Sequence, residues 1–320
     1  MYRLMGIAAA ALVAVATAHA ADKLPALSTS HAVSIVSSGA PGSSNDRAGR
    51  TFGQIAEKYT EQKFVVENRV GAGGYNAINY LMNQPADGMT IYAWTKSAAI
   101  VHLTHPGAVN LVESLHFIGI TMYAPFVIYT YAEGSPYPDA KSMFDDCKAH
   151  PGEQKWAGSP AGFIDWLMMQ IVWKATGCPG QYIPYDDGAA QVAAVMGKQV
   201  AISGGDMGDI VSRTDLLKPL AIASPERDSR LPDVPTLKEL GYDVVEQQHR
   251  GLAMRKEVPD NVKEFYKKLY EAVMADPDWA KYIVDQQAVV GGGGSEEMEK
   301  TVRQTETYGK QILKDAGIIQ

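Results

Sequence analysis

Short strand-like runs alternate with amphipathic helical stretches from about residue 32 onward, and this alternation restricts the fold more than any other feature. Residues 32–37, 63–67 and 90–94 have the composition of buried strands, and a helical stretch follows each of the first two. Chains that repeat a strand, a loop and a helix form largely parallel sheets with right-handed crossovers. We therefore predict an α/β fold, in which ligands bind at the carboxyl ends of the strands.

The first twenty residues have a different pattern. Arg3 precedes an apolar run over 4–16, which is followed by Ala18-His19-Ala20. The run is shorter than the roughly 20 apolar residues that span a bilayer, and a closing Ala-x-Ala motif is typical of a secretory signal peptide. We predict that residues 1–20 are a signal peptide and that cleavage after Ala20 gives an exported protein.

The residues after position 20 are too many for one hydrophobic core, so we expect two lobes. The apolar stretch over 118–131 contains Pro125 and predicts a strand that passes from one lobe to the other. The pattern of residues 243–254 predicts a second strand, which returns from the second lobe to the first. The expected division is a first lobe over 21–126, a second lobe over 127–246, and a return to the first lobe with C-terminal helices over 247–320.

Charge and cysteine content exclude several classes of protein. The formal net charge is −7, and no basic stripe that would favour nucleic acid is present. The two cysteines and the scattered histidines do not have the spacing of a zinc site, so we predict no metal and no cofactor. In an oxidising compartment Cys147 and Cys178 form either a disulfide or two separate buried thiols, and the sequence leaves both open.

Two loops rich in glycine and hydroxyl side chains precede predicted helices, one in each expected lobe. The candidate ligand-binding residues of the first loop are Ser38, Gly39, Ala40, Gly42, Ser43, Ser44, Asn45 and Asp46, and those of the second are Gly158, Ser159, Pro160, Ala161, Gly162 and Phe163. Free N–H groups and the helix dipole make such a helix start an anion site. The alternative for the first loop is an ordinary capping turn.

Neither the glycines nor the serines form a recognisable catalytic motif. The cluster over 71–74 departs from a dinucleotide-binding motif at Asn76, and we interpret it as close packing of a helix on a strand. No Gly-x-Ser-x-Gly occurs in the second loop, and no histidine or acid has an evident role as its base. We therefore predict no catalytic residue, which leaves a hydrolase acting through Ser159 or Ser43 as the least favoured alternative.

Several longer segments carry a family resemblance. They are residues 41–46 (PGSSND), 66–74 (VENRVGAGG), 85–90 (PADGMT), 183–185 (IPY) and 231–237 (LPDVPTL). Together they resemble the periplasmic receptors of tripartite tricarboxylate transporters, also called the Bug family, over nearly the whole chain after the signal peptide.

The resemblance implies a type II periplasmic binding fold, with two α/β lobes of mostly parallel sheet flanked by helices and two crossing strands as a hinge. It implies a periplasmic receptor, not an enzyme, that holds a small organic carboxylate between the two loops. The implied partners are a large multi-span permease and a small accessory membrane protein, and we expect a monomer. A sensor for a signalling system would use the same cleft and remains an alternative.

Two departures from the family pattern bear on the ligand. Gly39 stands where the family commonly has a bulky aromatic residue, and Phe163 stands where it commonly has a small hydroxyl. The exchange favours an aromatic dicarboxylate such as terephthalate ahead of a short aliphatic one, unless Phe163 packs inside the second lobe. Asp206 is expected near the far end of the ligand, and Arg250 and Arg47 are candidate counter-charges for a second carboxylate.

Overall fold

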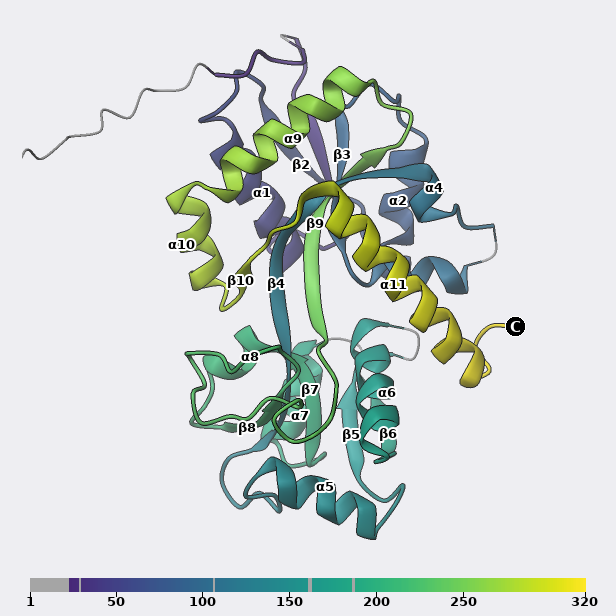
Figure 1. Ribbon diagram of the computed structural model, residues 1–320, viewed down its shortest axis with the longest axis vertical. Helices are drawn as coiled ribbons and strands as arrows, with labels where there is room; N and C mark the ends of the chain where they lie inside the picture. Colours follow the sequence, from purple (N-terminus) through teal and green to yellow (C-terminus); the bar gives the residue numbers. More distant parts are fainter. Residues whose placement is uncertain (1–22, 29, 106, 161–162, 186–187) are drawn as a thin grey trace, which may run out of the picture.

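Two lobes lie one above the other and are joined by two long strands (Figure 1). The computed structural model describes residues 23–28, 30–105, 107–160, 163–185 and 188–320, so the predicted signal peptide lies outside the described residues. The joining strands are β4 (Leu115–Tyr131) and β9 (Gln247–Arg255), which run side by side between the lobes. The arrangement confirms the expected two-lobed α/β fold.

The sheet of lobe 1 has the strand order β2-β1-β3-β9-β4, with β10 on the other edge of β4. Its remaining strands are β1 (Val33–Ser37), β2 (Phe64–Asn68), β3 (Thr90–Thr95) and β10 (Val289–Val290). β1 pairs in parallel with β2 and β3, whereas β9 and β4 pair antiparallel. The sheet is more mixed than predicted because the two crossing strands run in opposite directions.

Helices cover both faces of this sheet. One face carries α1 (Ser44–Ala56), α9 (Asp260–Met274) and α10 (Pro277–Asp285), and the other carries η1 (Ala72–Gly74), α2 (Tyr75–Met82), α3 (Ala98–Val101), η2 (His102–Thr104), α4 (Leu111–Ser114) and α11 (Gly294–Asp315). Ile35 packs with Phe52 and Leu269 on the first face, and its neighbour Val36 packs with Ile78 on the second. Because successive side chains of a strand alternate between faces, a strand covered on both sides is continuously apolar.

Lobe 2 repeats this plan with the strand order β8-β4-β7-β5-β6. Its own strands are β5 (Lys155–Gly158), β6 (Gln181–Pro184), β7 (Ile202–Asp206) and β8 (Leu217–Ile222). Helices α5 (Ala140–Ala149) and α6 (Ile164–Thr176) cover one face, and α7 (Gly188–Met196) and α8 (Met207–Val211) cover the other. In this lobe β5 pairs in parallel with β6 and β7. The crossing strand β4 pairs antiparallel with both of its neighbours, β7 and β8.

The hinge is the point at which β4 changes partners. From Leu115 to Pro125 it pairs with β9, and from Phe126 onward it pairs with β7 and β8. A second connection between the lobes is made by α11, whose Ile312 and Leu313 belong to the same buried cluster as Leu167 of α6. Any opening of the lobes about the hinge must therefore separate α11 from α6.

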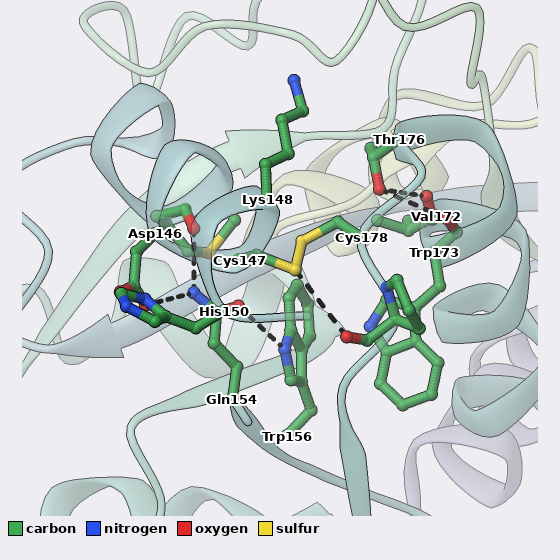
Figure 2. The surroundings of a disulfide bond; sticks show 12 residues. Asp146, Cys147, Lys148, His150, Gln154, Trp156, Val172, Trp173, Thr176 and Cys178 are labelled. Carbon is green, nitrogen blue, oxygen red and sulfur yellow. Dashed lines mark hydrogen bonds and ion pairs between the residues drawn. A yellow bond between two sulfur atoms is a disulfide. The ribbon is translucent and has the colours of Figure 1, made fainter. Parts of the chain in front are cut away.

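A disulfide joins Cys147, in the last turn of α5, to Cys178, which follows α6 (Figure 2). Their Cα atoms are 5.6 Å apart and both side chains are buried. Beside the bond, Trp156 donates to Gln154, which in turn donates to Asp146. The pairing decides between the two alternatives left open by the sequence, and it ties together the two helices on one face of lobe 2.

Candidate functional site

The first candidate loop is a capping turn at the carboxyl end of β1. Ser43 is the N-cap of α1, and its Oγ accepts a hydrogen bond from the Asp46 amide at 3.3 Å. Asn45 is buried and donates to Ser38 Oγ at 3.3 Å and to the carbonyl of Ala93 at 3.1 Å. The capping interpretation is therefore confirmed. It does not exclude an anion site, since one cap satisfies only one of the free N–H groups at a helix start.

The Asp46 side chain stabilises this turn through its hydrogen bonds. Its carboxylate accepts hydrogen bonds from the Gly42 amide at 3.0 Å, from Asn68 Nδ2 at 2.8 Å, and from two nitrogens of Arg50 at 2.9 and 3.0 Å. Burial alone would raise the pKa of Asp46, but the hydrogen bonds from Arg50, Gly42 and Asn68 outweigh it and lower the pKa to about 2. With both oxygens occupied, Asp46 orders the turn and contributes little free charge to a ligand.

The glycines of this turn have structural causes of their own. A β-carbon at Gly39 would stand 2.1 Å from Ser43 Oγ, so the cap itself requires glycine there. The carbonyl of Gly39 accepts from Asn68 Nδ2 at 2.8 Å, and that of Ala40 accepts from the Ser43 amide at 3.0 Å. Gly42 has a φ of +80°, which favours glycine. The absence of an aromatic residue at Gly39 thus follows from the local geometry of the cap, whatever the ligand.

The second candidate loop lies at the carboxyl end of β5. Tyr182 donates from its hydroxyl to the Ser159 carbonyl at 2.6 Å, and a β-carbon at Gly158 would clash with that hydroxyl at 2.0 Å. The Phe163 amide donates to the Pro160 carbonyl at 3.1 Å, which closes the turn at the start of α6. Ser159 Oγ is buried and has no hydrogen-bond partner among the described residues. Ala161 and Gly162, also predicted here, lie outside the described residues.

Phe163 connects this loop to lobe 1. Its ring lies against Gly73, in the glycine turn that precedes α2, with Val101 of α3 beside it. The alternative in which Phe163 packs inside lobe 2 is therefore wrong, because the ring reaches the other lobe. The second loop therefore contacts the glycine turn of lobe 1 through this ring.

Two cavities border Asp206, which lies at the end of β7. The first, of about 350 Å³, is lined from lobe 1 by Ser44, Arg47 and Arg250. The second, of about 230 Å³, includes the residue that follows Phe163 and is further lined by Tyr129, Asp165, Gln191 and Gln248. A larger cavity of about 870 Å³ lies between α9 and the start of α11, and none of the described residues of either loop lines it. Of the residues predicted from the sequence, Ser44, Arg47, Asp206 and Arg250 line the first cavity and Asp206 lines the second, whereas no described residue of the second loop lines either.

The two arginines of the first cavity differ in how firmly they are held. Arg47 donates to the Gly42 carbonyl at 2.6 Å and to Gln286 Oε1 at 3.0 Å. Arg250, on β9, lies 3.9 Å from the Asp206 carboxylate of the other lobe, which is at the outer limit of an ion pair. Arg250 is thus the cation more easily redirected to a bound anion.

Residues 49–318 match the tripartite tricarboxylate transporter family receptor. The chain belongs to this family. The match confirms the resemblance carried by the sequence motifs, and membership of a receptor family makes the chain a solute-binding receptor and not an enzyme. Among the described residues, no helix has both the length and the apolar character needed to cross a membrane.

One relative is similar to this chain in sequence, and two solved structures share its fold. Protein BugT of Bordetella pertussis is 29% identical over 207 residues, which are 63% of this chain and 63% of BugT. The structure of R. palustris Rpa4515 with adipate has a TM-score of 0.77 at 18% identity and covers 90% of this chain and 98% of that one. MatC from Rhodopseudomonas palustris with bound malate has a TM-score of 0.74 at 18% identity, over 88% and 98% of the two chains.

Three residues of the second cavity were not found from the sequence. Gln248 of β9 donates to Asp165 of α6 at 3.0 Å and so links the two lobes directly. Gln191 of α7 is buried and lines the cavity. Asp165 falls in the first turn of α6, next to a predicted loop, but its acidic side chain is equally typical of any helix start. No local motif distinguishes Gln191 or Gln248.

Proposed function

We propose that this receptor captures a small organic carboxylate between its lobes and delivers it to a membrane permease. The observation that supports this most is the 350 Å³ cavity, in which the start of α1 and Arg250 of lobe 1 face Asp206 of lobe 2. A helix start and an arginine both favour a carboxylate. Arg250 can exchange its long contact with Asp206 for a bidentate one with the ligand.

We propose an aromatic dicarboxylate such as terephthalate as the ligand, ahead of a short aliphatic diacid. Arg47 and Arg250 together provide for a second carboxylate, and the half-buried ring of Phe163 offers a flat apolar surface near the second loop. The adipate in Rpa4515 and the malate in MatC support a carboxylate as the ligand. Because both are aliphatic, a short aliphatic diacid is the alternative to an aromatic one.

The proposed mechanism is closure about the hinge between Pro125 and Phe126. Residues 21–126 with 247–320 move as one lobe and residues 127–246 as the other. Contacts from both lobes to one ligand exist only in the closed form, so ligand binding shifts the population toward closure. The contact of Phe163 with Gly73, and that of α11 with α6, are formed in this structure and belong to the closed form.

The proposed location of the mature receptor is the periplasm, where it is released when the signal peptide is cleaved after Ala20. A monomeric receptor would dock on a large multi-span permease and its small accessory protein once closed. A sensor role remains the second candidate, because docking on a signalling membrane protein would use the same closed form.

The test is a thermal-shift screen of the purified chain without its first twenty residues, using terephthalate, benzoate, adipate and malate. Terephthalate is expected to give the largest rise in melting temperature, equivalent to about 2.7 kcal/mol at a hundredfold excess over Kd. The ligand must be recovered unchanged. Absence of stabilisation by all four acids, or turnover of the stabilising one, would overturn the proposal. Uptake of labelled ligand in a deletion strain then separates transport from sensing.

A further inference from the structure

Gln191 has a buried hydrogen-bond acceptor that the protein itself does not use. Its side chain is 2% exposed, and its Nε2 donates to Ser203 Oγ at 2.8 Å and to the Gly204 carbonyl at 2.6 Å. Its Oε1 has no hydrogen-bond partner in the described part of the chain. A buried polar atom left without a partner is rare and costly in a folded protein.

The orientation of this amide is determined by its neighbours. Ser203 donates its own proton to the Ala157 carbonyl at 2.9 Å, so toward Gln191 its Oγ can only accept. The Gly204 carbonyl also accepts only. The nitrogen of Gln191 must therefore face these two atoms, and a flipped amide would place oxygen against oxygen. Since Gln191 lines the 230 Å³ cavity, its oxygen is the atom left for an occupant of that cavity.

Two carboxylates, those of Asp165 and Asp206, line the same cavity, together with the Tyr129 hydroxyl and the Gln248 amide. Asp165 accepts from Gln248 at 3.0 Å, and Asp206 lies 3.9 Å from Arg250 on the side of the first cavity. Two carboxylates and an amide oxygen attract an N–H or O–H donor and repel a carboxylate. The carboxylates of a ligand therefore belong in the cavity that contains Arg47 and Arg250, on the other side of Asp206.

We propose that the cavity at Gln191 is a subsite for a hydrogen-bond donor carried by the carboxylate ligand, namely an ammonium or a hydroxyl group. The two aspartates favour the ammonium. The subsite rests on the proposed function, because the carboxylate anchors the same ligand next to Arg250. Within the proposed carboxylate class, an amino- or hydroxy-substituted acid thus binds more tightly than its unsubstituted parent, and this applies to terephthalate as it does to an aliphatic diacid.

The experiment compares acids that differ only in this substituent, by calorimetry on the intact receptor. Succinate, malate and aspartate form the aliphatic series, and terephthalate, 2-hydroxyterephthalate and 2-aminoterephthalate form the aromatic one. In the series that fits the cleft, the donor-bearing acid is expected to bind at least about tenfold more tightly than its parent. Aspartate is expected to exceed malate, because its ammonium is charged.

Three variants locate the effect. Gln191→Met removes the acceptor at similar length and should remove the preference for both donors. Asp165→Asn keeps an oxygen but removes a charge, so it should reduce the preference for ammonium and spare that for hydroxyl. Asp215→Asn, exposed elsewhere in lobe 2, should change neither. If Gln191→Met does not fold, the Asp165→Asn result carries the test.

The outcomes separate the two proposals. Equal affinity for parent and substituted acids would overturn the donor subsite and leave the carboxylate receptor standing. Tighter binding of the hydroxy-substituted acids alone would support the donor subsite and overturn the proposed preference for an ammonium group. No binding of any of the six acids would overturn the carboxylate receptor itself.

Discussion

The ring of Phe163, at the start of α6, lies against Gly73 of the opposite lobe. A β-carbon at position 73 would stand 3.1 Å from the ring Cε1 and 2.6 Å from Val101 Cγ2. The lobes meet at this point because position 73 has no side chain. The glycine turn interpreted from the sequence as helix-to-strand packing thus also provides a contact surface for the other lobe.

Gly73→Ala is expected to hinder closure and to weaken ligand binding about tenfold, measured by calorimetry. Gly177→Ala is a matched control. Gly177 has a φ of +66° against +61° for Gly73, but a β-carbon there meets no atom within 4 Å. Both variants carry a backbone penalty of roughly 1 kcal/mol, which melting temperature reports. Equal affinities in the two variants would show that the contact with Phe163 does not govern closure.

Phe163→Ser is expected to reduce the preference for aromatic over aliphatic diacids, because it removes the flat apolar surface near the second loop. The measurement is the ratio of Kd values for adipate and terephthalate in the variant and the unaltered receptor. A parallel loss of affinity for both acids would mean that the ring serves lobe contact alone. An unchanged ratio would therefore remove the argument for aromatic ligands.

Arg250→Gln is expected to weaken terephthalate binding by about tenfold or more, because a charge-assisted hydrogen bond is lost. Benzoate, which has one carboxylate, should lose less. Arg227→Gln serves as a control, since Arg227 forms an exposed ion pair with Glu239 on the surface of lobe 2. Equal losses for the two acids would place Arg250 away from the second carboxylate.

Asp46 is expected to make the stability of the receptor depend on pH. Its pKa is about 2 in the folded protein and 3.8 in the reference state, so the unfolded chain binds more protons between these values. The carboxylate therefore contributes about 2 kcal/mol above pH 4, and this contribution is lost as the pH falls toward 2.

Urea unfolding at pH 7 and pH 3 measures the effect. Asp46→Asn should be less stable at pH 7 and should show a smaller decrease at pH 3 than the unaltered protein. A variant with undiminished pH dependence would show that other carboxylates dominate the acid transition.

Replacement of both Cys147 and Cys178 by serine is expected to lower the free energy of unfolding by about 3 to 4 kcal/mol, the chain-entropy value for a loop of this length. Ligand affinity should change little, because the bond lies between α5 and α6 and none of the residues lining the two cavities at Asp206 is a cysteine. A large loss of affinity in a folded variant would show that lobe 2 transmits strain from the disulfide to the cleft.

Local patterns in the sequence were sufficient for much of the fold. The helix predicted over 164–176 is α6, and the continuously apolar run that contains Ile35 and Val36 is the doubly covered strand β1. Helix periodicity, strand alternation and turn residues each depend on neighbours a few positions away. The two loops at helix starts followed from the same local chemistry.

The tertiary structure decided which distant residues meet. The pairing of Cys147 with Cys178, the reach of Phe163 to Gly73, and the bond from Gln248 to Asp165 all depend on how β4 and β9 cross between the lobes. Gln191 is an ordinary helical residue in the sequence, and only its burial against β7 leaves its oxygen without a hydrogen-bond partner among the described residues, beside a cavity that the residue lines. Sequence periodicity records which face of an element is buried, but it holds no information about the partner of that face.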